Sequence, residues 1–145
     1  MKLPNGITGF SNGGLETYDK QLFKRLCYGI VNRTGGEVLD WKDACYPRNH
    51  SRILALFGEE HFFIFVNETH PYIGFANIAE DSIVRYMDMP LLEAQFALNS
   101  YTVLSKEELE RPFLLTEHNL GEEEIQQVRF WRPSTLGEVI FNEWD

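Results

Sequence analysis

Residues 52–88, "RILALFGEEHFFIFVNETHPYIGFANIAEDSIVRYMD", contain four short runs at 52–57, 61–66, 72–78 and 82–88. The runs are rich in aromatic and β-branched residues, and the segments between them, "GEE", "NETHP" and "AED", have turn compositions. Because the runs recur at intervals of roughly ten residues, we expect neighbouring strands of an antiparallel meander. Run 61–66 is apolar on both faces, which predicts a central strand, whereas 82–88 alternates less clearly and fits an edge.

Helical patterns lie on both sides of these strands. Before them, residues 19–32 repeat apolar side chains at helical spacing, and Gly35–Gly36 should end that helix. "EVLDW" (37–41) predicts a short additional strand, and the glycine- and asparagine-rich opening through Tyr18 predicts irregular structure. The strand region is therefore preceded by one amphipathic helix.

After the strands, residues 91–98 predict a short apolar helix. Three polar pairs predict further helix starts. Two match capping boxes and one is a similar Asx-led start: Ser105–Glu108, Thr135–Glu138 and Asn119–Glu122. Apolar residues of the last segment fall on one helical face that extends to Trp144, so we expect a docked helix at the end of the sequence.

This order predicts a segregated α+β fold. It has an N-terminal helix, an antiparallel four- or five-stranded meander, and C-terminal helices packed on the sheet. A length of 145 residues is typical of one domain, here 1–145, and 43% hydrophobic and 14% aromatic residues favour a folded globule.

The sequence favours a cytoplasmic protein without membrane association. Its longest apolar run, residues 62–66, is far below the roughly 20 residues that a membrane span needs. "MKLPNGITGF" (1–10) lacks the apolar region of a secretory signal. We therefore expect Cys27 and Cys45 to be reduced thiols.

One motif resembles a hydrolase site. "GFSNG" (9–13) matches the G-x-S-x-G pattern of a nucleophile elbow, which needs a strand directly before it and a helix directly after it. Irregular sequence flanks the motif on both sides, so we expect Ser11 to be a turn residue. Cys45 and His50 could form a thiol and its base, but no third group is evident to orient them.

Metal and phosphate motifs are missing from the sequence. His50, His61, His70 and His118 show no H-E-x-x-H, H-x-H or C-x-x-C spacing, and there is no G-x-G-x-x-G or Walker A sequence. Basic residues are sparse and not interleaved with aromatic ones, which argues against nucleic-acid binding. We expect no catalytic residue, no metal, no cofactor and no enzymatic activity.

Charge is the most informative feature. The net charge is −9; residues 1–79 hold eight acidic and eight basic residues, whereas residues 80–145 hold fourteen acidic and five basic ones. An acidic surface repels nucleic acid and anionic lipid and attracts basic partners. Ordinary solubility and favourable interaction with helix N-termini are the alternative explanations for the same residues.

The two ends of the chain resemble a known group of proteins. "LPNGITGF" (3–10) and "FWRPSTLGEVIFNEWD" (130–145), together 24 residues, are similar to the ends of small bacterial proteins associated with the immunity proteins of polymorphic toxin systems. The resemblance implies a non-enzymatic inhibitor whose partner is a basic protein, such as a nuclease toxin. An acidic inhibitor would associate rapidly with such a toxin through electrostatic steering.

On this hypothesis the C-terminal acidic residues form the partner surface, with one tryptophan as an anchor. The predicted partner-binding residues are Glu107, Glu108, Glu110, Glu117, Glu122, Glu123, Glu124 and Trp131. Three alternatives stay open. They are a small-molecule binding or regulatory domain with a pocket between helices and sheet, an enzyme built from His50, His61 or His70 with a carboxylate, and a scaffold subunit that forms a homo-oligomer through an edge strand.

Overall fold

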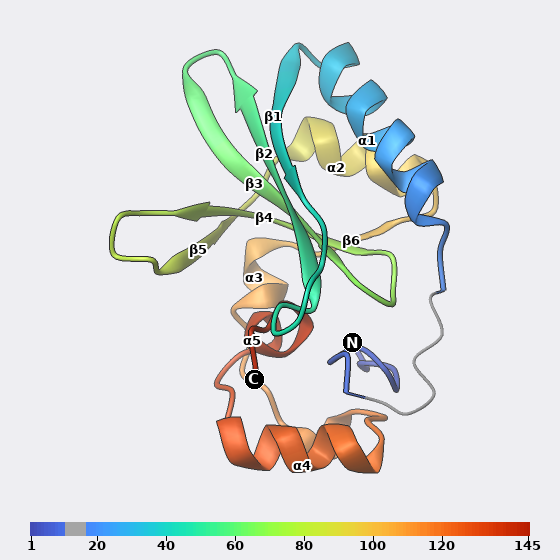
Figure 1. Cartoon of the computed structure of the whole chain (residues 1–145), viewed down its shortest axis with the longest axis vertical. Helices are drawn as coiled ribbons and strands as arrows, with labels where there is room; N and C mark the ends of the chain where they lie inside the picture. The colour runs from blue at the N-terminus through green and yellow to red at the C-terminus, as the bar shows by residue number, and fades with distance from the viewer. Residues whose placement is uncertain (11–16) are drawn as a thin grey trace.

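A five-stranded antiparallel meander forms the centre of the molecule (Figure 1). The computed structural model describes residues 1–10 and 17–145. Strand order follows the sequence: β1 (Gly36–Lys42), β2 (His50–Phe57), β3 (Glu60–Asn67), β4 (Tyr72–Ile78) and β5 (Val84–Met87). A two-residue strand that the sequence did not reveal, β6 (Thr102–Val103), pairs in parallel with β4. The predicted α+β fold and meander are confirmed.

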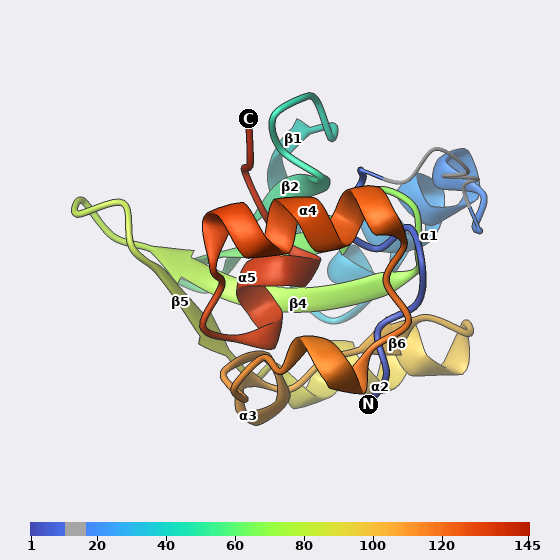
Figure 2. The same ribbon diagram turned by 90° about the horizontal axis from the view of Figure 1, so that it is seen from below.

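Helices cover both faces of the sheet. One face carries α1 (Lys20–Arg33) and α2 (Pro90–Leu98). The other carries the N-terminal segment and the remaining helices: α3 (Lys106–Leu109), the 3₁₀ helix η1 (Leu115–Glu117), α4 (Glu122–Trp131) and α5 (Leu136–Ile140). We call the first the α1–α2 face and the second the C-terminal face. Figure 2 shows α5 lying directly over β4, with α4 and α3 on either side of it.

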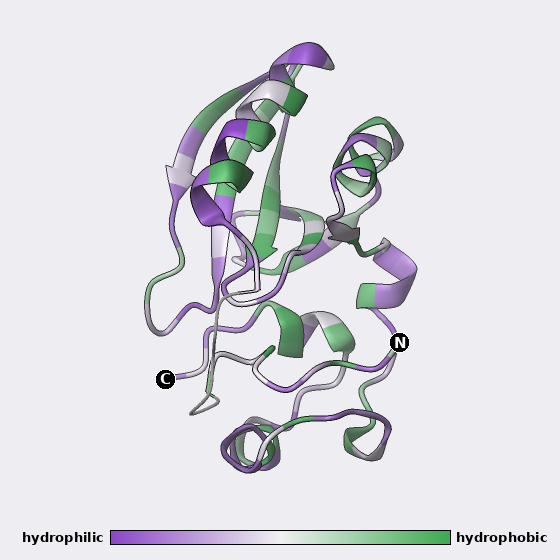
Figure 3. Cartoon of the chain, turned by 90° about the vertical axis from the view of Figure 1, so that its right-hand side faces the viewer, coloured by the Kyte–Doolittle hydropathy of each residue, from purple (hydrophilic) through white to green (hydrophobic). Residues whose placement is uncertain are grey.

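The alternation of side chains along β3 builds both cores. Phe62, Ile64 and Val66 pack on the α1–α2 face, whereas Phe63 and Phe65 pack on the C-terminal face. In Figure 3 hydrophobic residues run along the central strands and along one side of α1. The predictions of β3 as a central strand and β5 as an edge strand are thereby confirmed.

Two of the three predicted helix starts, those at Ser105 and Thr135, have the predicted cap residue. The Asp19 carboxylate accepts hydrogen bonds from the N–H groups of Gln21 and Leu22, and Ser105 and Glu108 form the predicted capping box. The start predicted at Asn119 is wrong: α4 begins at Glu122, and Gly121 is its N-cap. The carboxylate of Glu124, the third residue of the helix, accepts the Gly121 N–H at 3.1 Å and so fixes the start there.

The end of the chain also differs from the prediction. Thr135 caps α5 by accepting the N–H of Glu138, but the Glu138 carboxylate accepts from Ser134 rather than completing a capping box. The helix ends at Ile140, so the prediction that it reaches Trp144 is wrong. Trp144 is nevertheless buried, because its ring stacks on Trp131 at 6.4 Å between centroids. None of the helices in the described ranges is long and apolar enough to cross a membrane.

Candidate functional site

A buried carboxylate fixes the N-terminal segment on the C-terminal face. Glu124 of α4 is fully buried and accepts the N–H groups of Gly6 (2.7 Å) and Thr8 (2.8 Å) and the Thr8 hydroxyl. Gly6 has φ +99°, a conformation that strains any residue with a side chain. Because these donors enclose the charge, the prediction that Glu124 faces a partner is wrong.

Three buried asparagines join the two ends of the chain to the sheet. Asn67 donates to the carbonyl oxygens of Ile7 (2.9 Å) and Ile140 (2.8 Å), and Asn49 donates to that of Ile140 (3.0 Å). The backbone N–H of Asn142 donates to the Asn49 side-chain oxygen at 2.7 Å. These amides satisfy backbone groups that no strand or helix pairs.

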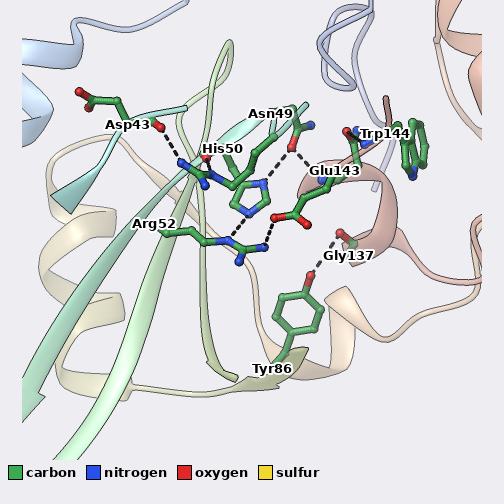
Figure 4. A network of polar contacts seen from close by, with 10 residues as sticks. Asp43, Asn49, His50, Arg52, Tyr86, Gly137, Glu143 and Trp144 are labelled. Carbon is green, nitrogen blue, oxygen red and sulfur yellow. Dashed lines mark hydrogen bonds and ion pairs between the residues drawn. The ribbon is translucent and has the colours of Figure 1, made fainter. Parts of the chain in front are cut away.

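Two hydrogen bonds and an ion pair connect this cluster to the surface (Figure 4). The Nε of Arg52 donates to the Nε2 of buried His50 at 3.0 Å, and the Arg52 Nη2 lies 3.0 Å from Glu143 Oε1. Arginine can only donate, so the His50 proton lies on Nδ1, which donates to Asn49 Oδ1 at 3.0 Å. Burial, with the charges of Arg52 and Arg48, holds the pKa of His50 well below its usual value.

A cavity of about 240 Å³ lies at the surface end of this series of contacts, beside Arg52 and Glu143. We call it the tryptophan hollow. Its lining combines aromatic rings, two carboxylates and one guanidinium: Arg52, Val84, Trp131, Pro133, Glu138, Phe141, Asn142, Glu143 and Trp144. The Trp131 indole donates to Gln127 at 3.2 Å and the residue is 36% exposed, so the side chain is held in place at the rim.

A second cavity, of about 330 Å³, adjoins the first, since Val84, Glu138 and Phe141 line both. We call it the tyrosine hollow, and the two together the groove. Its lining lies between β5 and α5 and consists of Ile83, Val84, Tyr86, Glu110, Thr135, Glu138 and Phe141. The hydroxyl of Tyr86 donates to the Gly137 carbonyl at 3.2 Å (Figure 4), and burial followed by the Glu138 charge raises the pKa of Tyr86.

The predicted partner-binding residues are only partly brought together. Glu110 and Trp131 lie at the groove, Glu110 in the tyrosine hollow and Trp131 in the tryptophan hollow. The other exposed or half-exposed acids lie on α3, on η1 and at the start of α4, and α5 lies between α3 and α4 (Figures 1 and 2). These acids are Glu107, Glu108, Glu117, Glu122 and Glu123.

Local interactions account for two of these acids. Glu107 lies 3.9 Å from Arg111, and Glu108 accepts from the N–H and hydroxyl of Ser105. Sequence reasoning missed Glu138 and Glu143 because both fell in a helix that the capping pattern already explained. Helical spacing from Leu136, Val139 and Ile140 places Glu138 on the opposite, polar side of that segment, which is the signal that could have found it. Glu143 lies beyond the end of α5 and had no such signal.

Cys45 and His50, the candidate thiol and its base, are not arranged as a catalytic pair. Both ring nitrogens of His50 are hydrogen-bonded inside the molecule, so it cannot act as a base for the exposed Cys45. Ser11 lies outside the residues that the structure describes. Within the residues that are described, no three histidine, cysteine, aspartate or glutamate side chains lie close enough to hold a metal ion.

Comparison of the chain with protein-family models, with curated proteins and with solved structures gives no match.

Proposed function

We propose that the chain is a non-enzymatic protein-binding domain that acts in the cytoplasm as an immunity-type inhibitor of a basic toxin. The observation that carries this proposal is the groove, where Glu110, Glu138 and Glu143 lie beside the partly exposed Trp131 and the more deeply buried rings of Tyr86, Phe141 and Trp144. Aromatic residues are the commonest anchors of protein interfaces, and carboxylates around them select a basic partner.

The rim of the tryptophan hollow supports the protein-binding part of the proposal. Phe130 is 74% exposed, its ring lies 5.3 Å from that of Trp131, and Trp131 stacks on Trp144. Large exposed rings that contact one another cost solvation free energy in the free protein. A partner that covers them would recover that free energy.

The rigidity of the groove supports it further. Arg52 is hydrogen-bonded to buried His50, and Tyr86 is held against α5 by its bond to Gly137. An added Cβ at Gly137 would lie 2.6 Å from the Tyr86 ring, so this contact requires glycine. A preorganised surface loses little conformational entropy on binding.

The test is capture of partners from lysate of the source organism on tagged protein, at low and at moderate salt. We expect one stoichiometric basic protein, retained better at low salt, whose own activity falls when this chain is added. The Trp131→Ala variant should lose that protein, and Trp41→Ala, on the opposite face of the molecule, should retain it. Capture that depends neither on salt nor on Trp131, or a captured protein that stays fully active, would contradict the proposal.

A small-molecule binding domain is the second candidate, because the tyrosine hollow lies between a helix and the sheet and its volume reaches the low end of ligand pockets, roughly 300–1,000 Å³. A metabolite that raises the melting temperature of the chain, and no longer does so when a larger residue replaces Thr135 in the lining of the hollow, would favour this candidate.

A further inference from the structure

The lining of the tyrosine hollow carries negative charge and no positive charge. Its lining includes the carboxylates of Glu110 and Glu138 and no lysine, arginine or histidine. Within the described ranges neither carboxylate has an ion-pair partner. In the adjoining tryptophan hollow, by contrast, Glu143 is paired with Arg52 at 3.0 Å.

One of these carboxylates is held in a fixed position. Glu138 lies in the first turn of α5. One of its carboxylate oxygens accepts the N–H of Ser134, and the backbone N–H of Glu138 donates to the Thr135 hydroxyl. The other oxygen accepts no hydrogen bond from the described part of the chain. A neutral backbone donor orients the group without neutralising it, so capacity for a charged donor remains.

The walls of the hollow suit a flat cation on an apolar stem. The rings of Tyr86 and Phe141 lie 6.3 Å apart at 41°, and Ile83, which is 54% exposed, and Val84 add aliphatic surface. A guanidinium stacks on aromatic rings and binds carboxylates through two parallel hydrogen bonds, whereas an ammonium is a compact charge. The stem of the side chain would pack on the aliphatic residues.

The molecule uses the same arrangement one hollow away. The guanidinium of Arg52 lies 5.0 Å from the centre of the Phe65 ring while it pairs with Glu143. Phe65 in turn contacts both Tyr86 and Phe141, so the two hollows share one aromatic cluster.

We propose that the tyrosine hollow accepts an arginine side chain of the partner, with its guanidinium between Glu110 and Glu138 and against the rings of Tyr86 and Phe141. This proposal rests on the proposed function, since it names the group through which a basic partner is recognised. A lysine side chain and a neutral planar group are the alternatives that the experiment separates.

The experiment is a titration of the whole chain, followed by amide and ring resonances in NMR. The probes are N-acetyl-arginine amide, N-acetyl-lysine amide and N-acetyl-citrulline amide, the last being a neutral isostere of arginine. We expect arginine to shift the amides of Thr135, Gly137 and Glu138 and the Tyr86 ring. Citrulline should leave them unchanged, and lysine should bind at least about threefold more weakly.

Variants locate the site. Glu138→Gln and, independently, Glu110→Gln should each weaken the arginine response by about threefold or more, and Glu37→Gln on β1 should not change it. Two separate carboxylate variants keep the test decisive if one of them fails to fold. Equal responses to arginine and citrulline, equal responses to arginine and lysine, or an arginine response that survives both variants would overturn the proposal.

Failure of this proposal and failure of the proposed function are distinguishable. A captured basic protein that both glutamine variants retain at full affinity would leave the proposed function standing and remove the arginine site. Arginine binding without any captured protein would leave the arginine site standing and remove the support for the proposed function.

Discussion

Both faces of the sheet have an apolar core, and the C-terminal face adds a set of buried polar contacts that hold distant segments of the chain. On the α1–α2 face, apolar side chains of two helices pack on the strands, with rings such as Phe23, Phe75 and Phe96 at its centre. On the C-terminal face, apolar packing is joined by buried hydrogen bonds that Glu124 accepts and that Asn49 and Asn67 donate, and these bonds fix the N-terminal segment and the end of α5. Periodic apolar sequence accounts for the first face, whereas the second depends in addition on single polar residues far apart in the chain.

The groove lies on the C-terminal face, and its tyrosine hollow follows the junction between β5 and α5. The α1–α2 face should therefore contribute stability alone, while changes on the C-terminal face should affect both stability and the groove. Three predictions test that division.

The largest effect is expected from the α1–α2 core. Phe75→Ala should lower the free energy of unfolding by about 3–5 kcal/mol, because the ring is fully buried and leaves a cavity. The indole N–H resonances of Trp131 and Trp144 should keep their positions. Phe65→Ala should destabilise the chain similarly but also shift both indole signals, since Phe65 supports Arg52 and Phe141. Urea unfolding measures the stability and NMR the indole signals. Identical spectra for both variants would show that the C-terminal face is no more closely coupled to the groove than the α1–α2 face.

A smaller loss is expected from the asparagine cluster. Asn67→Leu should cost about 2–4 kcal/mol, because the buried N–H group of Thr69 and the partly buried one of His70 lose their acceptor. Hydrogen exchange at Gly6 and Thr8 should accelerate more than exchange in α1, since Asn67 also holds Ile7. Asn77→Leu, an exposed position on β4, is the matched control. A uniform acceleration across both faces would show that the N-terminal segment has no separate attachment.

The third prediction concerns pH. The pKa of His50 is lowered in the folded chain, chiefly by burial, so below its usual value of 6.5 the unfolded chain binds more protons than the folded one. Stability should be constant above about pH 7 and fall as the pH drops below about 6.5, by at most roughly 1.4 kcal/mol per pH unit from this residue. Burial lowers the pKa values of His70 and His118 as well, and both act in the same direction.

Urea midpoints between pH 5 and 8 measure this dependence. His50→Phe should flatten the curve even though it destabilises the chain, and His61→Gln, at an exposed position, should leave the slope unchanged. An unaltered slope in His50→Phe would mean that the other histidines account for it.

The same division explains what the sequence could predict. Helical spacing in α1 and alternation in β2–β5 predict the sheet and its first face, because apolar periodicity reports directly on burial. The role of Glu124 was not predictable, since its donors Gly6 and Thr8 lie more than a hundred residues away and an acid in a first helical turn is ordinarily exposed. Glu110 and Trp131 were predicted correctly to lie on the surface, but their neighbours in the groove, Arg52 and Tyr86, come from distant strands.

The most direct test of the groove is the affinity of the captured basic partner for two matched triple variants. Glu110→Gln/Glu138→Gln/Glu143→Gln removes three charges at the groove, and Glu37→Gln/Asp40→Asn/Glu60→Gln removes three charges from exposed positions of β1 and β3. Both variants remove three of the nine net negative charges, so general attraction of a basic partner weakens equally in each. We predict that the groove variant binds at least about tenfold more weakly than the strand variant. Equal affinities would contradict the account, because the groove would then contribute only its share of the overall charge.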